Sequence, residues 1–293
     1  MRFPSLAVRF LMLAATALCS VTARAQAVPA AVYTDPPADA AHPAAMTALH
    51  IPSHGVLING IVYQPVGAGV HPTLVICHGL PGNEKNLDLA QAVRRAGWNA
   101  VTFNYRGSWG SPGKFSFAQN LEDARAVLAY LRDPANAARL GVDRKRMVLA
   151  GHSMGGWVTA QTAARDPELS GAILISAADM GYLGHAPREQ VVATMADNME
   201  ALAGVTAASM ADEVIANAGA FSLDNTAAGL ARMPLLVLSA DDGLAPRTDA
   251  LVKAIGAKGG QKVTSIHAAT DHGWSDRRIF LEAAVIDWLG ELK

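Results

Sequence analysis

A regular alternation of short apolar runs and longer segments with helical spacing constrains the fold of this chain more than any other feature. Apolar runs that predict strands cover residues 56–63, 73–78, 100–105, 146–150, 171–176, 235–239 and 262–267. Segments that predict helices cover residues 83–96, 117–132, 156–165, 246–258 and 277–292. Strands that alternate with helices form a mostly parallel sheet covered on both faces, because the connections are crossovers. The sequence therefore predicts a doubly wound α/β domain over residues 46–293.

The composition fits one large core, and it argues against binding to nucleic acid or to an anionic membrane. Of the 293 residues, 51% are hydrophobic and 17% are charged, so the chain can bury one sizeable core. The formal net charge is -1 and no basic run is present, which removes the usual electrostatic reason for binding nucleic acid or an anionic membrane. We therefore expect a small-molecule partner, and the sequence leaves the oligomeric state open.

Residues 1–25 have the pattern of a secretory signal peptide. Arg2 and Arg9 precede an apolar run at residues 10–21, and the sequence Ala-Arg-Ala at 23–25 fits a cleavage site. The apolar run is well short of the roughly 20 residues that a membrane-spanning helix requires. We expect an exported protein, periplasmic or secreted, without stable membrane insertion.

The segment that follows the expected cleavage site is rich in alanine and proline. This composition disfavours helix and sheet, so residues 26–45 are predicted to be a flexible or extended lead-in. Cys19 is lost with the signal peptide, which leaves Cys77 as the one cysteine of the mature chain and allows no intramolecular disulfide. Because Cys77 lies in an apolar run, we interpret it as a buried structural thiol.

One motif predicts a nucleophile. The stretch GHSMG at 151–155 fits G-x-S-x-G, and it lies between a predicted strand and a predicted helix. On such a turn Ser153 takes a strained backbone conformation, and Gly151 and Gly155 remove side chains that would collide with the neighbouring strand and helix. This placement favours a nucleophilic serine over an ordinary glycine-rich turn.

A serine hydroxyl needs a base, and the base needs a carboxylate that orients it. In this fold class the chain order is serine, acid, histidine, and the histidines after Ser153 are His185, His267 and His272. His272 is the preferred base, because it follows the predicted strand by a short loop and precedes the last helix. His267, which ends an apolar alternation, is the alternative, and His185 lies in a different segment.

The acid is expected on the loop after the strand at 235–239. Asp242 is the preferred candidate, because it stands four residues before Pro246, which opens the next predicted helix. Asp241 is then a turn former, and Asp179, after an earlier strand, is a minor alternative.

Two backbone N–H groups are expected to bind the developing oxyanion. The residue after the nucleophile, Met154, supplies one of them. The loop HGLPG at 78–82 supplies the other through Leu80, and Gly79 in this loop allows a close approach of the backbone. Polar clusters follow four of the predicted strands, so these loops converge on one cleft at the carboxyl edge of the sheet.

With these residues in place, the chain resembles an α/β-hydrolase of the serine type. The stretches that carry the resemblance are HGLPG at 78–82, NYRGSWGSPG at 104–113, GHSMGG at 151–156, LSADDGLAP at 238–246 and TDHGW at 270–274. The resemblance implies Ser153, Asp242 and His272 as the triad and Leu80 with Met154 as the oxyanion hole. The loop with Arg106 and Gly107 is read as mainly structural.

Departures from related families narrow the expected chemistry. The loop is HGLPG instead of the HGGG of many carboxylesterases, and a serine stands where haloalkane dehalogenases carry aspartate and dienelactone hydrolases carry cysteine. Residues 103–131 are also similar to the catalytic domain of prolyl oligopeptidase-like proteins, although the chain has no room for their N-terminal propeller.

The stretch at 178–233 is longer than a minimal crossover and carries helical spacing with Met195, Met199 and Met210, which predicts a small helical cap over the cleft. No metal-ligand spacing and no nucleotide-binding motif is found, so no cofactor is expected. The sequence predicts an exported esterase that cleaves small or medium acyl compounds through an acyl-enzyme. A serine peptidase or amidase, and a non-catalytic binding protein on the same fold, are the alternatives.

Overall fold

The computed structural model of the protein describes residues 27–292, and it contains one mostly parallel sheet of eight strands. The strands are β1 (Ala45–Ser53), β2 (Val56–Gln64), β3 (His71–Cys77), β4 (Asn99–Phe103), β5 (Val142–His152), β6 (Gly171–Ile175), β7 (Leu235–Ala240) and β8 (Val263–Ala268). Their order across the sheet is β1-β2-β4-β3-β5-β6-β7-β8. β2 pairs antiparallel with both β1 and β4, and the other pairs are parallel. The doubly wound α/β fold is confirmed.

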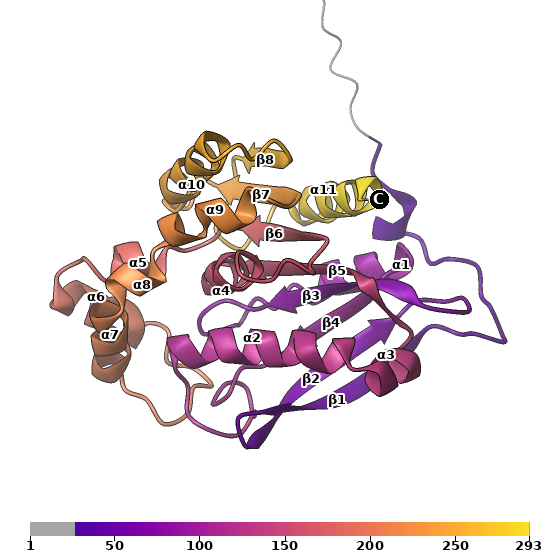
Figure 1. Ribbon diagram of the computed structural model, residues 1–293, viewed down its shortest axis with the longest axis horizontal. Coiled ribbons are helices and arrows are strands. Elements are labelled where there is room, and N and C mark those ends of the chain that lie inside the picture. The colour runs from indigo at the N-terminus through magenta and orange to yellow at the C-terminus, as the bar shows by residue number, and fades with distance from the viewer. Residues whose placement is uncertain (1–26, 293) are drawn as a thin grey trace, which may run out of the picture.

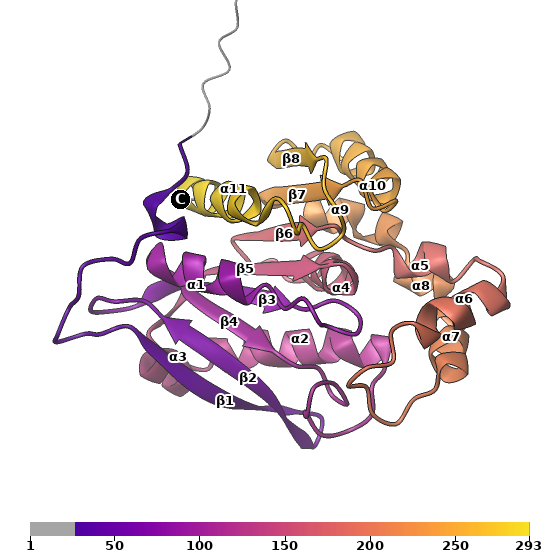
Figure 2. The ribbon, with the colours of Figure 1, turned by 180° about the vertical axis from the view of Figure 1, so that it is seen from behind.

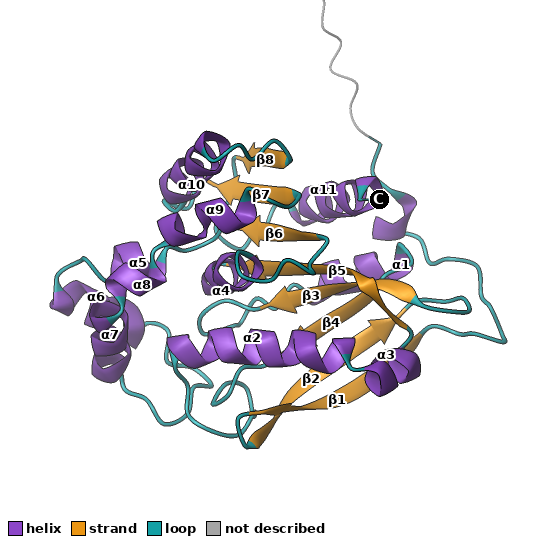
Figure 3. Cartoon of the chain, in the orientation of Figure 1, coloured by secondary structure: helices purple, strands orange, loops and turns teal. Residues whose placement is uncertain are grey.

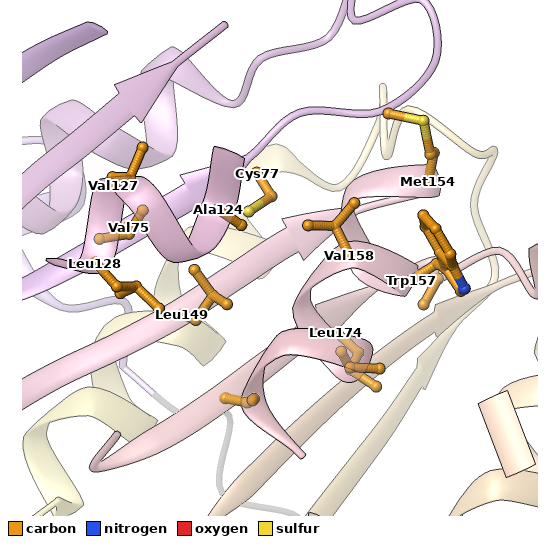
Figure 4. Close-up of a cluster of buried hydrophobic side chains, with 14 of the residues drawn as sticks. Val75, Cys77, Ala124, Val127, Leu128, Leu149, Met154, Trp157, Val158 and Leu174 are labelled. Atoms are coloured by element: carbon orange, nitrogen blue, oxygen red, sulfur yellow. The ribbon is translucent and has the colours of Figure 1, made fainter. Parts of the chain in front are cut away.

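Helices cover both faces of this sheet, as Figures 1 and 2 show from opposite sides. One face carries α2 (Phe117–Arg132), α3 (Pro134–Leu140), α4 (Met154–Ala163) and α10 (Ala245–Ala257), and the other carries α1 (Leu87–Arg95) and α11 (Arg278–Glu291). Each face has its own apolar cluster, and successive residues of a strand alternate between them. In β3, Val75 and Cys77 face the first cluster, whereas Leu74 and Ile76 face the second. Figure 4 shows part of the first cluster, with Cys77 and Trp157 among its side chains.

The predicted cap is present between β6 and β7. It consists of α5 (Met180–Leu183), α6 (Arg188–Ala196), α7 (Ala207–Ala216), α8 (Ala218–Phe221), the 3-10 helix η2 (Leu223–Thr226) and α9 (Ala227–Leu230). In Figure 1 the arrowheads of β3, β6 and β7 point toward α5 to α8, so the outer cap helices lie beyond the carboxyl edge of the strands. Met195 and Met210 are fully buried, which agrees with their predicted role in the packing of the cap.

Three elements differ from the sequence-based expectations, and Figure 3 labels two of them, the strand β1 and the helix α3. Strand β1 was not predicted, because its apolar residues alternate with polar ones beside the proline-rich lead-in. The short helix α3 was also missed, although Asp133 caps it and Pro134 opens it. Within the lead-in 26–45, residues Ala30–Val32 form a 3-10 helix, η1, whose carbonyl groups accept hydrogen bonds from the Arg95 guanidinium at 2.5 and 2.8 Å.

The signal peptide predicted for residues 1–25 lies outside the described residues. Over the part of the chain that the structure describes, no helix is both long enough and apolar enough to cross a membrane.

Candidate active site

Ser153 occupies a sharp turn between β5 and α4. Its backbone has φ 58° and ψ -123°, a positive φ that costs energy in a residue with a side chain. Gly151 and Gly155 flank this turn. A Cβ added at Gly151 would lie 2.0 Å from the carbonyl oxygen of Gly155, and one added at Gly155 would lie 2.1 Å from that of Cys77. The turn therefore requires both glycines, as the G-x-S-x-G motif predicted.

Two backbone N–H groups are free beside Ser153. Met154 is the first residue of α4, so its N–H has no acceptor within the helix, and among the described residues neither this group nor the N–H of Leu80 makes a hydrogen bond. Leu80 lies on the loop after β3. A Cβ at the adjacent Gly79 would lie 3.0 Å from Cβ of Ser153, which is tighter than an ordinary contact, so a glycine favours this close approach of the loop to the serine. The arrangement offers two donors at the amino end of a helix, where negative charge is stabilised.

The structure brings Asp242 and His272 together from the loops after β7 and β8. Nδ1 of His272 lies 2.8 Å from Oδ2 of Asp242, and the backbone N–H of Leu244 donates to Oδ1 at 2.9 Å. The Asp242 side chain is only 2% exposed, whereas that of His272 is 41% exposed. Burial opposes the charge of Asp242, but hydrogen bonds from His272, the Leu244 N–H and Ser176 outweigh it and lower the pKa of this carboxyl group. The pair thus has an ionised acid inside and an accessible imidazole outside.

One cavity of about 860 Å³ contains both Ser153 and His272. Leu80 and Met154 also line it, so the two candidate oxyanion donors belong to the same space. The cap closes the cavity on the other side with a mixed set of side chains: Asp179, Tyr182, Leu183, His185, Gln190, Met195 and Asn198. The serine, the histidine and the free N–H groups therefore surround a space large enough for a small organic molecule.

The alternative residues that the sequence left open lie elsewhere or have other partners. His267, on the outermost strand β8, pairs with Asp241 at 2.9 Å, and neither lines the cavity. Asp179 accepts hydrogen bonds from backbone N–H groups at the start of α5, both at 3.1 Å, and so acts as a helix cap. His185 is exposed on the cap and lines the cavity. The structure therefore favours Asp242 and His272 as the acid and the base.

Three residues outside the predicted triad contact the acid or the base, directly or through one another, and the sequence did not predict these contacts. His152, next to the nucleophile, lies with Nε2 2.8 Å from the carbonyl oxygen of His272, and the centroids of the two rings are 4.6 Å apart with the ring planes tilted by 40°. Nε1 of Trp274 donates to Oγ of Ser176 at 3.1 Å, and Ser176 in turn bonds Asp242. Trp274 belongs to the stretch TDHGW at 270–274, so the sequence did indicate that it lies near the site. Ser176 ends an apolar run, and no sequence pattern indicates its role.

The loop with Arg106 is structural, as expected. The Arg106 Nε donates to the fully buried carboxylate of Asp123 at 2.7 Å, and Asp123 also accepts from Ser53 at 2.5 Å. This network fixes the loop against α2. Trp109, on the same loop, donates to the carbonyl oxygen of Pro81 at 2.7 Å and so links it to the loop that carries Leu80.

Cys77, the last residue of β3, is buried in the core. Burial raises the pKa of the Cys77 thiol to about 12, so it stays protonated and serves packing. No group of three or more His, Cys, Asp or Glu side chains that could hold a metal ion is found within residues 27–292.

Fold and site together define a serine-type α/β-hydrolase, and a comparison with known families agrees. The model of the S33 serine aminopeptidase family matches residues 69–218, which is more than half of the chain. The chain belongs to this family.

Individual relatives are distant. The quorum-quenching protein AidA of Acinetobacter baumannii is 31% identical over 127 residues, which cover 41% of this chain and 40% of that protein. The chain thus spans about two fifths of the curated relatives that it matches.

Solved structures resemble the chain over most of its length. The acylaminoacyl peptidase of Pyrococcus horikoshii has a TM-score of 0.66 at 16% identity, and the match covers 85% of this chain and 42% of that one. An esterase of Pyrobaculum calidifontis has a TM-score of 0.63 at 20% identity, with 85% and 86% covered. At these identities the similarity shows a shared fold.

Proposed function

We propose that this chain is an exported serine hydrolase that cleaves carboxylic esters of small or medium acyl compounds. The observation that carries the proposal is the geometry of one cavity. Ser153 on its strained turn and His272, held by Asp242 at 2.8 Å, open into the same space of about 860 Å³. A hydroxyl, a base and a buried carboxylate in this order are the parts that acyl transfer requires.

The proposed reaction follows from the atoms that each group leaves free. Asp242 holds Nδ1 of His272, so Nε2 of the ring is the atom that takes the proton from the Ser153 hydroxyl. The serine oxygen attacks the ester carbonyl, and the N–H groups of Leu80 and Met154 bind the resulting oxyanion. When the tetrahedral intermediate collapses, the bond to the alcohol oxygen breaks, and His272 returns the proton to the leaving alcohol.

Water completes the second half of the proposed cycle. His272 takes a proton from water, the hydroxide attacks the acyl-enzyme, and collapse of the second intermediate releases the acid and regenerates the Ser153 hydroxyl. Throughout, the lowered pKa of Asp242 keeps its carboxylate ionised, so that it stabilises the imidazolium without accepting its proton.

The test is the rate of hydrolysis of a graded series of p-nitrophenyl acyl esters. The proposal predicts turnover that is lost in Ser153→Ala and retained in Ser265→Ala, a matched change at an exposed serine of β8. The optimum chain length measures the acyl pocket beneath the cap. Turnover in Ser153→Ala equal to that of the native chain would overturn the assignment of the nucleophile.

A serine peptidase or amidase is the second candidate, and the description of the matched family as serine aminopeptidases favours it. It predicts turnover of an aminopeptidase-type anilide series without turnover of the esters. If neither series reacts and no serine-directed phosphonate labels the protein, the fold serves binding instead of catalysis.

Export is proposed on the pattern of residues 1–25. The corresponding test is the amino-terminal sequence of the protein recovered from the cells that produce it. A chain that begins at Gln26 supports the proposal, and one that retains residues 1–25 in the cytoplasm contradicts it.

A further inference from the structure

An exposed, positively charged side chain of α10 lines the cavity. Arg247 lies in the first turn of α10, and it borders the cavity with Leu244 and Pro246. Its guanidinium carbon lies 4.0 Å from the ring centroid of Tyr182, which comes from the cap helix α5 and lines the same space. Arg247 and Tyr182, both exposed, thus join α10 to the cap at the wall of the cavity.

No acidic side chain neutralises Arg247 within the described part of the chain. No carboxylate forms an ion pair with it, and its guanidinium donates no hydrogen bond to another residue. The carboxylate in the same cavity, Asp179, uses one oxygen to accept from the N–H groups of Gly181, Tyr182 and Leu223. A guanidinium is always charged in water. The cavity therefore contains a cation whose donors are free for a ligand.

The position of Arg247 at the amino end of α10 favours an anionic ligand. A cation in the first turn of a helix faces the positive end of the helix dipole, where an anion is preferred. An anion at this place would be attracted by Arg247 and by the dipole together. Contact with an aromatic ring holds the guanidinium in place and leaves its N–H donors free, and two of these can bind a carboxylate in parallel.

We propose that Arg247, held by Tyr182, is a specificity residue that selects esters carrying an ionised carboxylate in addition to the scissile bond. The inference rests on the proposed function and names its substrate class. Since the same cavity contains Ser153 and His272, a substrate can place its ester at the serine and its carboxylate at Arg247. Neutral esters lack this second attachment and bind less well.

The test compares two pairs of substrates that differ only by a methyl group on the carboxylate. One pair places the charge on the acyl side, mono-p-nitrophenyl adipate against p-nitrophenyl methyl adipate. The other places it on the leaving group, 4-acetoxybenzoate against its methyl ester. We expect at least one acid to exceed its methyl ester in kcat/KM by roughly threefold to tenfold, mainly through a lower KM, as a charge-assisted pair at a partly exposed site provides.

Variants assign this preference to Arg247. Arg247→Gln abolishes this preference, because kcat/KM for the acids falls to that for their methyl esters. Lys253→Gln, which removes a positive charge from an exposed position of the same helix, leaves it intact. Tyr182→Phe keeps the ring and the preference, and Tyr182→Leu weakens it. Salt at about 1 M reduces the preference in the native chain, because the charges are partly exposed.

The outcomes separate this inference from the function on which it rests. Hydrolysis of neutral esters without a preference for the acids, or with a preference that Arg247→Gln does not change, overturns the carboxylate subsite and leaves the esterase proposal standing. No hydrolysis of any ester in either pair overturns the esterase proposal itself.

Discussion

The buried imidazole of His152 makes the stability of this protein dependent on pH in the mildly acidic range. His152 is 5% exposed, and burial, together with the nearby His272, lowers its pKa to about 4 from the usual 6.5 of a histidine. The unfolded chain therefore binds the proton more readily than the native one between these two values. The stability that the neutral ring contributes is fully present above the pKa that His152 has in the unfolded chain. It is lost as the pH falls toward the pKa that His152 has in the native chain. At pH 5 the loss from this residue amounts to about 2 kcal/mol.

The assay is urea unfolding at about pH 8 and about pH 5 for the native chain and for His152→Gln. Glutamine retains an N–H donor for the carbonyl oxygen of His272 but does not titrate. We expect the difference in unfolding free energy between the two pH values to shrink by about 2 kcal/mol in the variant. Some dependence remains, because burial also lowers the pKa of His78 to about 4. His50→Gln, at an exposed position of β1, is the control.

The reasoning is refuted if His152→Gln loses as much stability between the two pH values as the native chain does. If the variant is less stable than the native chain by the same amount at both pH values, His152 contributes only packing and a hydrogen bond. A smaller pH dependence in His50→Gln than in His152→Gln would likewise contradict the assignment to the buried ring.

Three further predictions concern the elbow, the loop network and the acid. Gly155→Ala places a Cβ 2.1 Å from the Cys77 carbonyl oxygen and is expected to cost about 3 kcal/mol or more in thermal unfolding, whereas Gly256→Ala, whose Cβ meets nothing, costs none. Asp123→Asn removes the fully buried charge beside Arg106, which keeps its ion pair with Glu122 at 2.5 Å, and lowers the free energy of unfolding in urea by about 2 kcal/mol; a loss below a tenth of that amount would contradict the role of the buried ion pair. Asp242→Asn retains the fold by circular dichroism but lowers kcat for ester hydrolysis by roughly 10⁴, and a loss of less than tenfold would argue against its role.

Local patterns accounted for the fold and the nucleophile turn. The strand, turn and helix around Ser153 are adjacent in the chain, and the two glycines that the turn needs stand in the motif itself. The buried parallel strands were also recognisable, since each is a continuous apolar run. β1 was not, because it pairs antiparallel at the edge of the sheet and its outward residues are polar or exposed.

The arrangement of the cavity could not be read from local patterns. The preference for His272 over His267 came from position alone, and the structure shows the reason, since His267 is paired with Asp241 away from the cavity. The pairing of Arg247 with Tyr182 joins α10 to the cap, two elements that are distant in sequence. Such contacts depend on how the cap sits on the sheet, which spacing does not specify.

Labelling with a fluorophosphonate, followed by mass spectrometry of the peptides, tests the central claim most directly. The account predicts one adduct, on Ser153, that is absent in Ser153→Ala and forms far more slowly in His272→Ala. No adduct on the native chain, or an adduct that persists in Ser153→Ala, would contradict it.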